Sequence, residues 1–114
     1  MSDLLSGLDE AWRWLNQAGI NEGGTYDIEL FFEAPSSESA APLAVDLEQF
    51  GCTKGLIREV RAGILRKHTE YILSATLSEF TLTKGNLRDL VVTMRERASS
   101  YGCVFDGWEV QPED

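Results

Sequence analysis

Two carboxylates and one histidine are the residues of this chain that suggest acid–base or metal chemistry. Asp27 and Glu29 stand two residues apart in an alternating stretch, so they share one face of a strand and could share a proton. The one histidine, His68, lies in a basic stretch without an acid or thiol near it in sequence. A metal shell or a catalytic triad needs such neighbours. We therefore predict no catalytic residue and no metal site, and interpret Asp27 and Glu29 as solvated strand residues.

The two cysteines end a repeated triplet, Phe50-Gly51-Cys52 and Tyr101-Gly102-Cys103. They are too few for a disulfide framework and lack the paired spacing of zinc or redox sites, so we expect both to be reduced and structural. Each triplet follows a strand-like and a helix-like stretch and precedes another strand-like run. The chain therefore reads as two copies of strand, helix, strand.

Charge and composition limit the partners. The 114 residues suffice for one domain with a core, and 43% of them are hydrophobic. The formal net charge is -9, from 19 acidic and 10 basic side chains, which is the opposite of a phosphate-binding balance. The acidic charge indicates either a protein partner with a basic surface or a role in solubility alone. We expect a protein partner, no direct nucleic-acid binding and no cofactor.

No targeting signal is recognised. The start, Met1-Ser2-Asp3-Leu4-Leu5, lacks a basic leader followed by an apolar core. No apolar run approaches the ~18 residues that span a bilayer. We therefore expect a cytoplasmic protein without membrane contact.

The apolar periodicity predicts a helix followed by a domain of order β-α-β-β-α-β. We assign residues 1–20 to the N-terminal helix and 21–114 to the domain. Glycines stop both domain helices, at Gly51 and Gly102. The expected elements are helix 3–18, strand 25–33, a helix from 35 to 50, strands 53–61 and 70–80, a helix from Thr81 or Thr83 to Tyr101, and strand 104–110.

This order is the split βαβ arrangement of ferredoxin-like domains, an α+β class. Right-handed crossovers require a four-stranded antiparallel sheet of order 4-1-3-2, with both domain helices on one face. The other face would then carry Asp27, Glu29, Phe31 and Glu33, since residues two apart share a face. The N-terminal helix either covers that face or pairs with a second copy, so monomer and homodimer both stay open.

Of two activities known on this fold, the sequence excludes the first and disfavours the second. Acylphosphatases need an arginine in the loop after the first strand, and here that loop, 34–38, has no basic residue. RNA-recognition domains stack bases on aromatics of the first and third strands, and only Phe31 is suitably placed. Half of the basic residues lie at positions 54–67, which favours either an edge hairpin protected by charge or a basic patch for an acidic partner.

The segment Phe105-Asp106-Gly107-Trp108 resembles the aromatic-Asp-Gly-Trp signature of the RraB family, regulators of ribonuclease E activity. The strand 26–32 and the turn 50–52 are similar to the family's opening strand and aromatic-Gly turn, and the similarity covers residues 21–110. The resemblance implies a ferredoxin-like domain without catalysis of its own. In the best-known members this domain binds ribonuclease E and inhibits RNA cleavage.

Two hypotheses follow. The first is a regulator that acts by protein contact, in which Trp108 either packs in the core or at the sheet edge or is an exposed interface anchor. The second is a small-molecule-sensing module that holds a ligand on the open sheet face, beside Phe31 and Ile72, or at a dimer interface. For the first hypothesis the candidate partner-binding residues are Asp27, Glu29, Phe31, Asp106, Gly107 and Trp108.

Overall fold

The computed structural model describes residues 8–20, 22–53, 55–61 and 69–111. The predicted α+β class and the order of elements are confirmed. Four sequence predictions lie wholly or partly outside the described residues: the start of the first helix, half of the basic stretch at 54–67, the interpretation of His68, and the tail 112–114. The elements are α2 (Leu8–Gln17), β1 (Thr25–Ala34), α3 (Ser37–Phe50), β2 (Leu56–Arg61), β3 (Thr69–Thr81), α4 (Lys84–Ser100) and β4 (Val104–Gln111).

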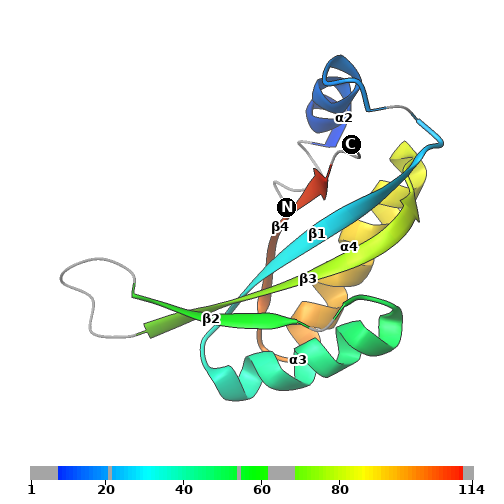
Figure 1. Cartoon of the computed structure of the whole chain (residues 1–114). Coiled ribbons are helices and arrows are strands. Elements are labelled where there is room, and N and C mark those ends of the chain that lie inside the picture. Colours follow the sequence, from blue (N-terminus) through cyan, green and yellow to red (C-terminus); the bar gives the residue numbers. More distant parts are fainter. Residues whose placement is uncertain (1–7, 21, 54, 62–68, 112–114) are drawn as a thin grey trace.

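The four strands form one antiparallel sheet in the order β2-β3-β1-β4. This is the predicted order 4-1-3-2 read from the other edge. Figure 1 shows α3 and α4 packed with the sheet, whereas α2 lies apart from them beside the end of β4. Each half of the chain therefore contributes one central strand and one edge strand: β1 and β2 come from the first half, and β3 and β4 from the second.

The core lies between the sheet and the two domain helices. Alternation along β1 places Ile28, Leu30 and Phe32 on this side, and all three are fully buried. The Phe32 ring is tilted against that of Phe105, with centroids 5.2 Å apart. Burying each such side chain stabilises the fold by about 1.5–3 kcal/mol. The helices complete this core with Leu43 and Leu47 of α3 and with Leu87, Val91 and Met94 of α4.

The repeated aromatic-Gly-Cys triplet forms the same helix stop twice. The N–H groups of Cys52 and Cys103 each donate to the carbonyl five residues earlier, at 2.9 Å, and those of Gly51 and Gly102 to the carbonyl three residues earlier, at 3.1 Å. This pair of bonds is the Schellman motif, which requires the positive φ of the two glycines, 122° and 73°. Both cysteines are buried and free. Burial raises the pKa of the Cys52 thiol to about 11, so this thiol stays neutral at physiological pH.

The starts of the two domain helices also follow the sequence. The Ser36 hydroxyl accepts a hydrogen bond from the Ser39 N–H at 3.1 Å, and the Thr83 hydroxyl accepts one from the Asn86 N–H at 3.0 Å. Each satisfies a donor that the first helical turn would otherwise leave unpaired. Of the two predicted starts for α4, Thr83 is therefore the cap.

Helix α2 packs against β4. Leu15 is buried in the core cluster, while Trp14 is 69% exposed. A hollow of about 380 Å³ separates this helix from Trp108 and Val110. Those two residues pair with Leu30 and Ile28, so α2 meets the helix-bearing side of the sheet at its β4 edge. Within the described residues, no helix has the length and apolar character needed to cross a membrane.

Candidate docking site on the open face of the sheet

The face of the sheet opposite α3 and α4 is the candidate site, and we call it the open face. Strand alternation and register decide which side chains lie on it. The register partners of Phe31 are Ser74 on β3 and Gly107 on β4, and Ser74 in turn pairs with Leu56 on β2. The open face comprises Leu56 and Arg58 of β2, Ile72, Ser74 and Thr76 of β3, Asp27, Glu29, Phe31 and Glu33 of β1, and Asp106, Gly107 and Glu109 of β4.

A shallow hollow lies at the centre of the open face. It measures about 160 Å³ and is bordered by an apolar group, Phe31, Ile72 and the 71% exposed Leu56. Ser74, Glu29 and Arg58 complete its lining. Apolar surface of this kind, set among charged side chains, is typical of a protein contact site.

A β-bulge in β4 lies next to Phe31, on the side of β1 away from this hollow. Phe31 pairs with Gly107, whereas the next residue, Phe32, pairs with Phe105, so Asp106 is an extra residue in the ladder. Such a bulge leaves two successive residues on one side of the strand. Asp106 and Gly107 therefore both lie on the open face, beside Phe31.

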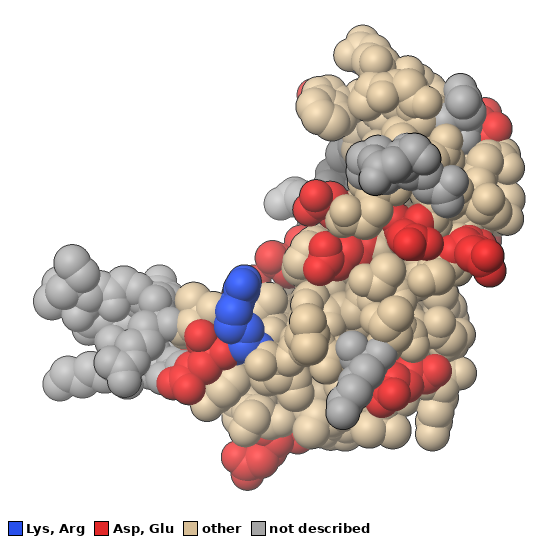
Figure 2. Space-filling model, viewed as in Figure 1, with Lys and Arg blue, Asp and Glu red and all other residues tan. Residues whose placement is uncertain are grey.

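Carboxylates crowd the same part of the open face. Glu29 and Glu109 are directly opposite each other on β1 and β4. Partial burial raises the pKa of Glu33, and the neighbouring carboxylates of Asp106 and Glu70 raise it further. Figure 2 shows acidic side chains recurring over the visible surface, with little basic surface among the described residues. The open face therefore presents a negative field around an apolar centre.

Two of the predicted acidic residues also support the sheet itself. Asp27 lies at a second bulge, where β3 carries the left-handed residue Glu79 with φ 55°. The Glu79 N–H donates to the Asp27 carboxylate at 3.2 Å. Gln111 Nε2 donates to Glu29 at 3.3 Å, which ties the end of β4 to β1. The Asp27 carboxylate therefore stabilises the bulge between β1 and β3, while Glu29 also borders the hollow.

Of the six predicted partner-binding residues, Glu29 and Phe31 line the hollow, while Asp106 and Gly107 lie on β4 at the other side of Phe31. Trp108 is half-buried and lies on the other side of the sheet, where it packs against the core beside α2. Sequence reasoning missed three open-face residues, Leu56, Arg58 and Glu109. The weak alternation of β2 gave no face assignment for the first two.

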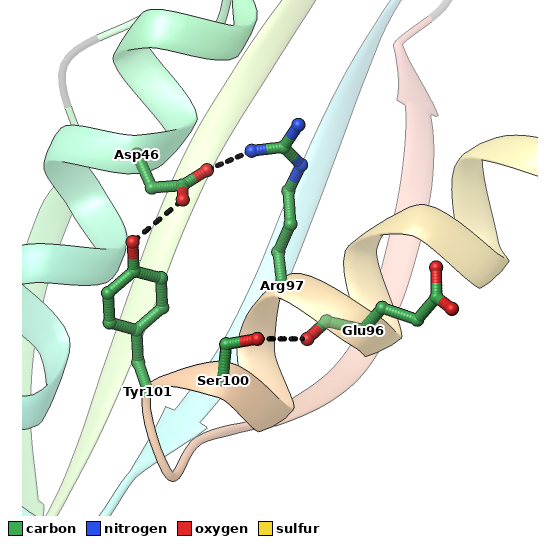
Figure 3. Close-up of polar contacts among 5 residues, drawn as sticks. All are labelled: Asp46, Glu96, Arg97, Ser100 and Tyr101. Atoms are coloured by element: carbon green, nitrogen blue, oxygen red, sulfur yellow. Dashed lines mark hydrogen bonds and ion pairs between the residues drawn. The ribbon is translucent and has the colours of Figure 1, made fainter.

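A separate polar cluster joins α3 to α4 (Figure 3). The carboxylate of Asp46 accepts hydrogen bonds from Tyr101 Oη, at 2.7 Å, and from Arg97 Nη1. These partners lower the pKa of Asp46, the Tyr101 bond most strongly, while partial burial opposes them. The Arg97 guanidinium also lies 4.8 Å from the ring centroid of Phe50. The polar contacts of this cluster join α3 to the end of α4, so the cluster stabilises the packing of the two helices. We call it the helix brace.

Neither region has the composition of a metal centre. Across the described ranges, no group of three or more His, Cys, Asp or Glu residues is arranged to hold a metal ion. The described residues form a small α+β domain with one helix-covered and one uncovered sheet face.

Comparison with known families agrees with this class of domain. Residues 9–110 match the RraB family, described as regulator of ribonuclease activity B. The match covers most of the chain, so the chain belongs to the RraB family. Among curated proteins, no significant match is found. The resemblance inferred from the aromatic-Asp-Gly-Trp segment is thereby confirmed, and the family role is regulatory.

Proposed function

We propose that this protein is a non-catalytic regulator that binds a ribonuclease, with ribonuclease E as the partner, and lowers its RNA cleavage. The observation that carries the proposal is the family match over residues 9–110. The resemblance seen in the sequence supplies the choice of ribonuclease E. The proposal places the protein in the cytoplasm, where it would act on RNA turnover.

The open face supports this function physically. RNA-binding enzymes use Lys and Arg to neutralise phosphates. A surface that groups Glu29, Glu33, Asp106 and Glu109 offers such cations an alternative partner and accelerates encounter through long-range attraction. Binding of this surface to a basic segment of the enzyme would remove that segment from RNA.

The hypothesis of a small molecule on the open face receives less support from the geometry. Pockets for small ligands usually measure about 300–1,000 Å³ and enclose most of the ligand. The hollow beside Phe31 and Ile72 measures about 160 Å³ and lies on an uncovered sheet. Its size suits a side chain of a protein partner better than a metabolite.

The test is a cleavage assay with purified ribonuclease E and a defined RNA, with and without this protein, together with a direct binding measurement. We expect association that weakens as salt rises, because screening reduces attraction between exposed charges. The variant Glu109→Lys reverses an exposed charge on the open face and should bind at least about tenfold more weakly.

The matched control is Glu48→Lys, which reverses an exposed charge on α3, away from the open face. It should bind and inhibit as the unaltered protein does. Absence of both association and any change in cleavage with the unaltered protein would rule out the proposed partner.

A further inference from the structure

We infer that the hollow between α2 and β4 holds one arginine side chain of a basic protein partner, stacked against the indole rings of Trp14 and Trp108. This inference rests on the proposed function, because it adds a second contact, beside the open face, with the same partner. It follows from three features: an indole that the fold leaves exposed, the size and lining of the hollow, and the charge at its rim.

Trp14 leaves its indole in solvent, although its neighbours in α2 face the domain. Leu15 is buried in the core cluster, and Trp12 packs against that cluster as a half-buried side chain. Trp14 lies between them in sequence and is 69% exposed. Tryptophan is enriched among the few residues that dominate the affinity of protein contacts. The exposed indole is therefore a candidate anchor for a partner.

The hollow brings this indole together with a second one. It measures about 380 Å³, within the range of about 300–1,000 Å³ that ligand-binding sites have. In Figure 1, α2 lies beside the end of β4 and apart from α3 and α4, so a partner can approach the hollow without displacing the core. The lining residues are Ala11, Trp14 and Leu15 of α2, and Trp108, Glu109 and Val110 of β4.

Charge at the rim favours a cation. Of the described residues that line the hollow, Glu109 is the charged one, and it is exposed. It lies directly opposite Glu29 on β1, so a positive group at this end of β4 would relieve the repulsion between two carboxylates. Indole faces also attract cations, because the π-system is negative over the face of the ring. Both features select a positively charged group over an apolar one.

Arginine suits these surroundings better than lysine. Its planar guanidinium stacks on aromatic faces and is more weakly hydrated than an ammonium group, so it loses less on leaving water. The same packing occurs within this domain, where the Arg97 guanidinium lies 4.8 Å from the ring centroid of Phe50. Glu109 belongs to both the open face and the rim of the hollow, so one basic segment of a protein can cross the β4 edge and contact both.

Two peptides of equal charge and three variants test this site. The fluorescein-labelled peptides alternate serine with arginine in one and with lysine in the other, so both carry the same charge to the open face. Trp14→Leu and Trp108→Leu each remove an indole and keep an apolar side chain. Trp12→Leu is the matched control, because it removes the other indole of α2, which does not line the hollow.

By fluorescence anisotropy, we expect the unaltered protein to bind the arginine peptide about fivefold more tightly than the lysine peptide. Trp14→Leu and Trp108→Leu should abolish this preference, and Trp12→Leu should keep it. Circular dichroism and urea unfolding show whether each variant is folded. Equal binding of both peptides by the unaltered protein would overturn the inference, as would an undiminished preference in folded Trp14→Leu.

Sedimentation velocity over a range of concentrations tests the other occupant, a second copy of this chain. We expect the unaltered protein and Trp14→Leu to have the same oligomeric state. A dimer that Trp14→Leu dissociates would assign the hollow to an interface between copies and contradict the inference.

The same variants separate this inference from the function on which it rests. If the unaltered protein inhibits ribonuclease E and folded Trp14→Leu binds and inhibits it equally well, the arginine site is wrong and the regulatory function stands. If the unaltered protein does not bind ribonuclease E but prefers the arginine peptide through Trp14, the arginine site stands and its partner is another basic protein.

Discussion

Phe31 and Phe32 are neighbours in the chain, but they serve opposite faces of β1. Phe32 is fully buried against Phe105, in the core under α3 and α4. Phe31 borders the hollow on the uncovered face, beside Gly107. The helix-covered face stabilises the domain, whereas the open face leaves apolar surface exposed that the fold does not use. Of the two side chains, only that of Phe31 is therefore available to a partner.

The charges divide in the same way. Between the helices, Asp46 has both Tyr101 and Arg97 as partners, and its pKa is lowered. On the open face, partial burial raises the pKa of Glu33, and the nearby carboxylates of Asp106 and Glu70 raise it further. Favourable pairing stabilises a folded chain, whereas crowded like charges oppose folding and attract an external cation. Charge therefore separates the two faces as clearly as burial does.

The largest expected effect compares the two phenylalanines directly. Phe32→Ala should lower the free energy of unfolding by about 3–5 kcal/mol, because it empties a fully buried site. Phe31→Ala should lower it by less than about 1 kcal/mol, since the side chain is only half-buried. Urea titration followed by circular dichroism measures both. Similar losses for the two variants would contradict the division of faces.

A smaller effect is expected at the helix brace. Asp46→Asn should cost about 1 kcal/mol at neutral pH, because it weakens one hydrogen bond and removes one ion pair. In the unaltered protein the stabilisation from Asp46 is present above the unfolded pKa, 3.8, and is lost as pH falls through the lowered folded pKa. Urea titrations from about pH 7 to pH 2 should therefore show a flatter acid decline for the variant. An unchanged decline would show that the brace contributes nothing.

The smallest expected effect, at Glu33, is a gain in stability, whereas the preceding variants lose stability. Because the pKa of Glu33 is raised in the fold, this group favours folding below the unfolded value of 4.5, and that contribution is lost as pH rises through the folded pKa. Glu33→Gln should remove this loss and raise the free energy of unfolding at pH 7 by up to about 0.5 kcal/mol. Glu48→Gln, an exposed change on α3, is the control. A destabilised Glu33→Gln protein would mean that the crowded carboxylates support the fold.

Most of the fold could be predicted because its signals are local. The alternation of β1 assigned Phe31 and Phe32 to opposite faces, and Gly51 and Gly102 marked both helix ends. The strand order followed from the duplicated strand-helix-strand pattern and the handedness of the crossovers. The start of β2 was expected at Thr53 and is at Leu56, because this edge strand has little alternation to define it.

The site was less predictable, because it depends on contacts between distant segments. Phe31, Asp106 and Gly107 could be proposed from residue type, but their adjacency comes from a bulge that no local pattern marks. The Asp46–Arg97 contact spans 51 residues and needs the packing of two helices. Its one sequence signal is a carboxylate, Asp46, placed between the buried Ala44 and Leu47 of α3.

The extra residue in β4 decides where the end of the chain points. Phe105 faces the core, and in an unbroken strand Gly107 would follow it inward, so that the indole of Trp108 would emerge on the uncovered side. Because Asp106 is inserted, every later residue is turned over, and the indole reaches α2 instead. Deleting this single aspartate would leave a regular ladder in which Phe105 still pairs with Phe32 and Gly107 with Phe31, so the indole would stay on the side of α2 and only the carboxylate beside Phe31 would be lost.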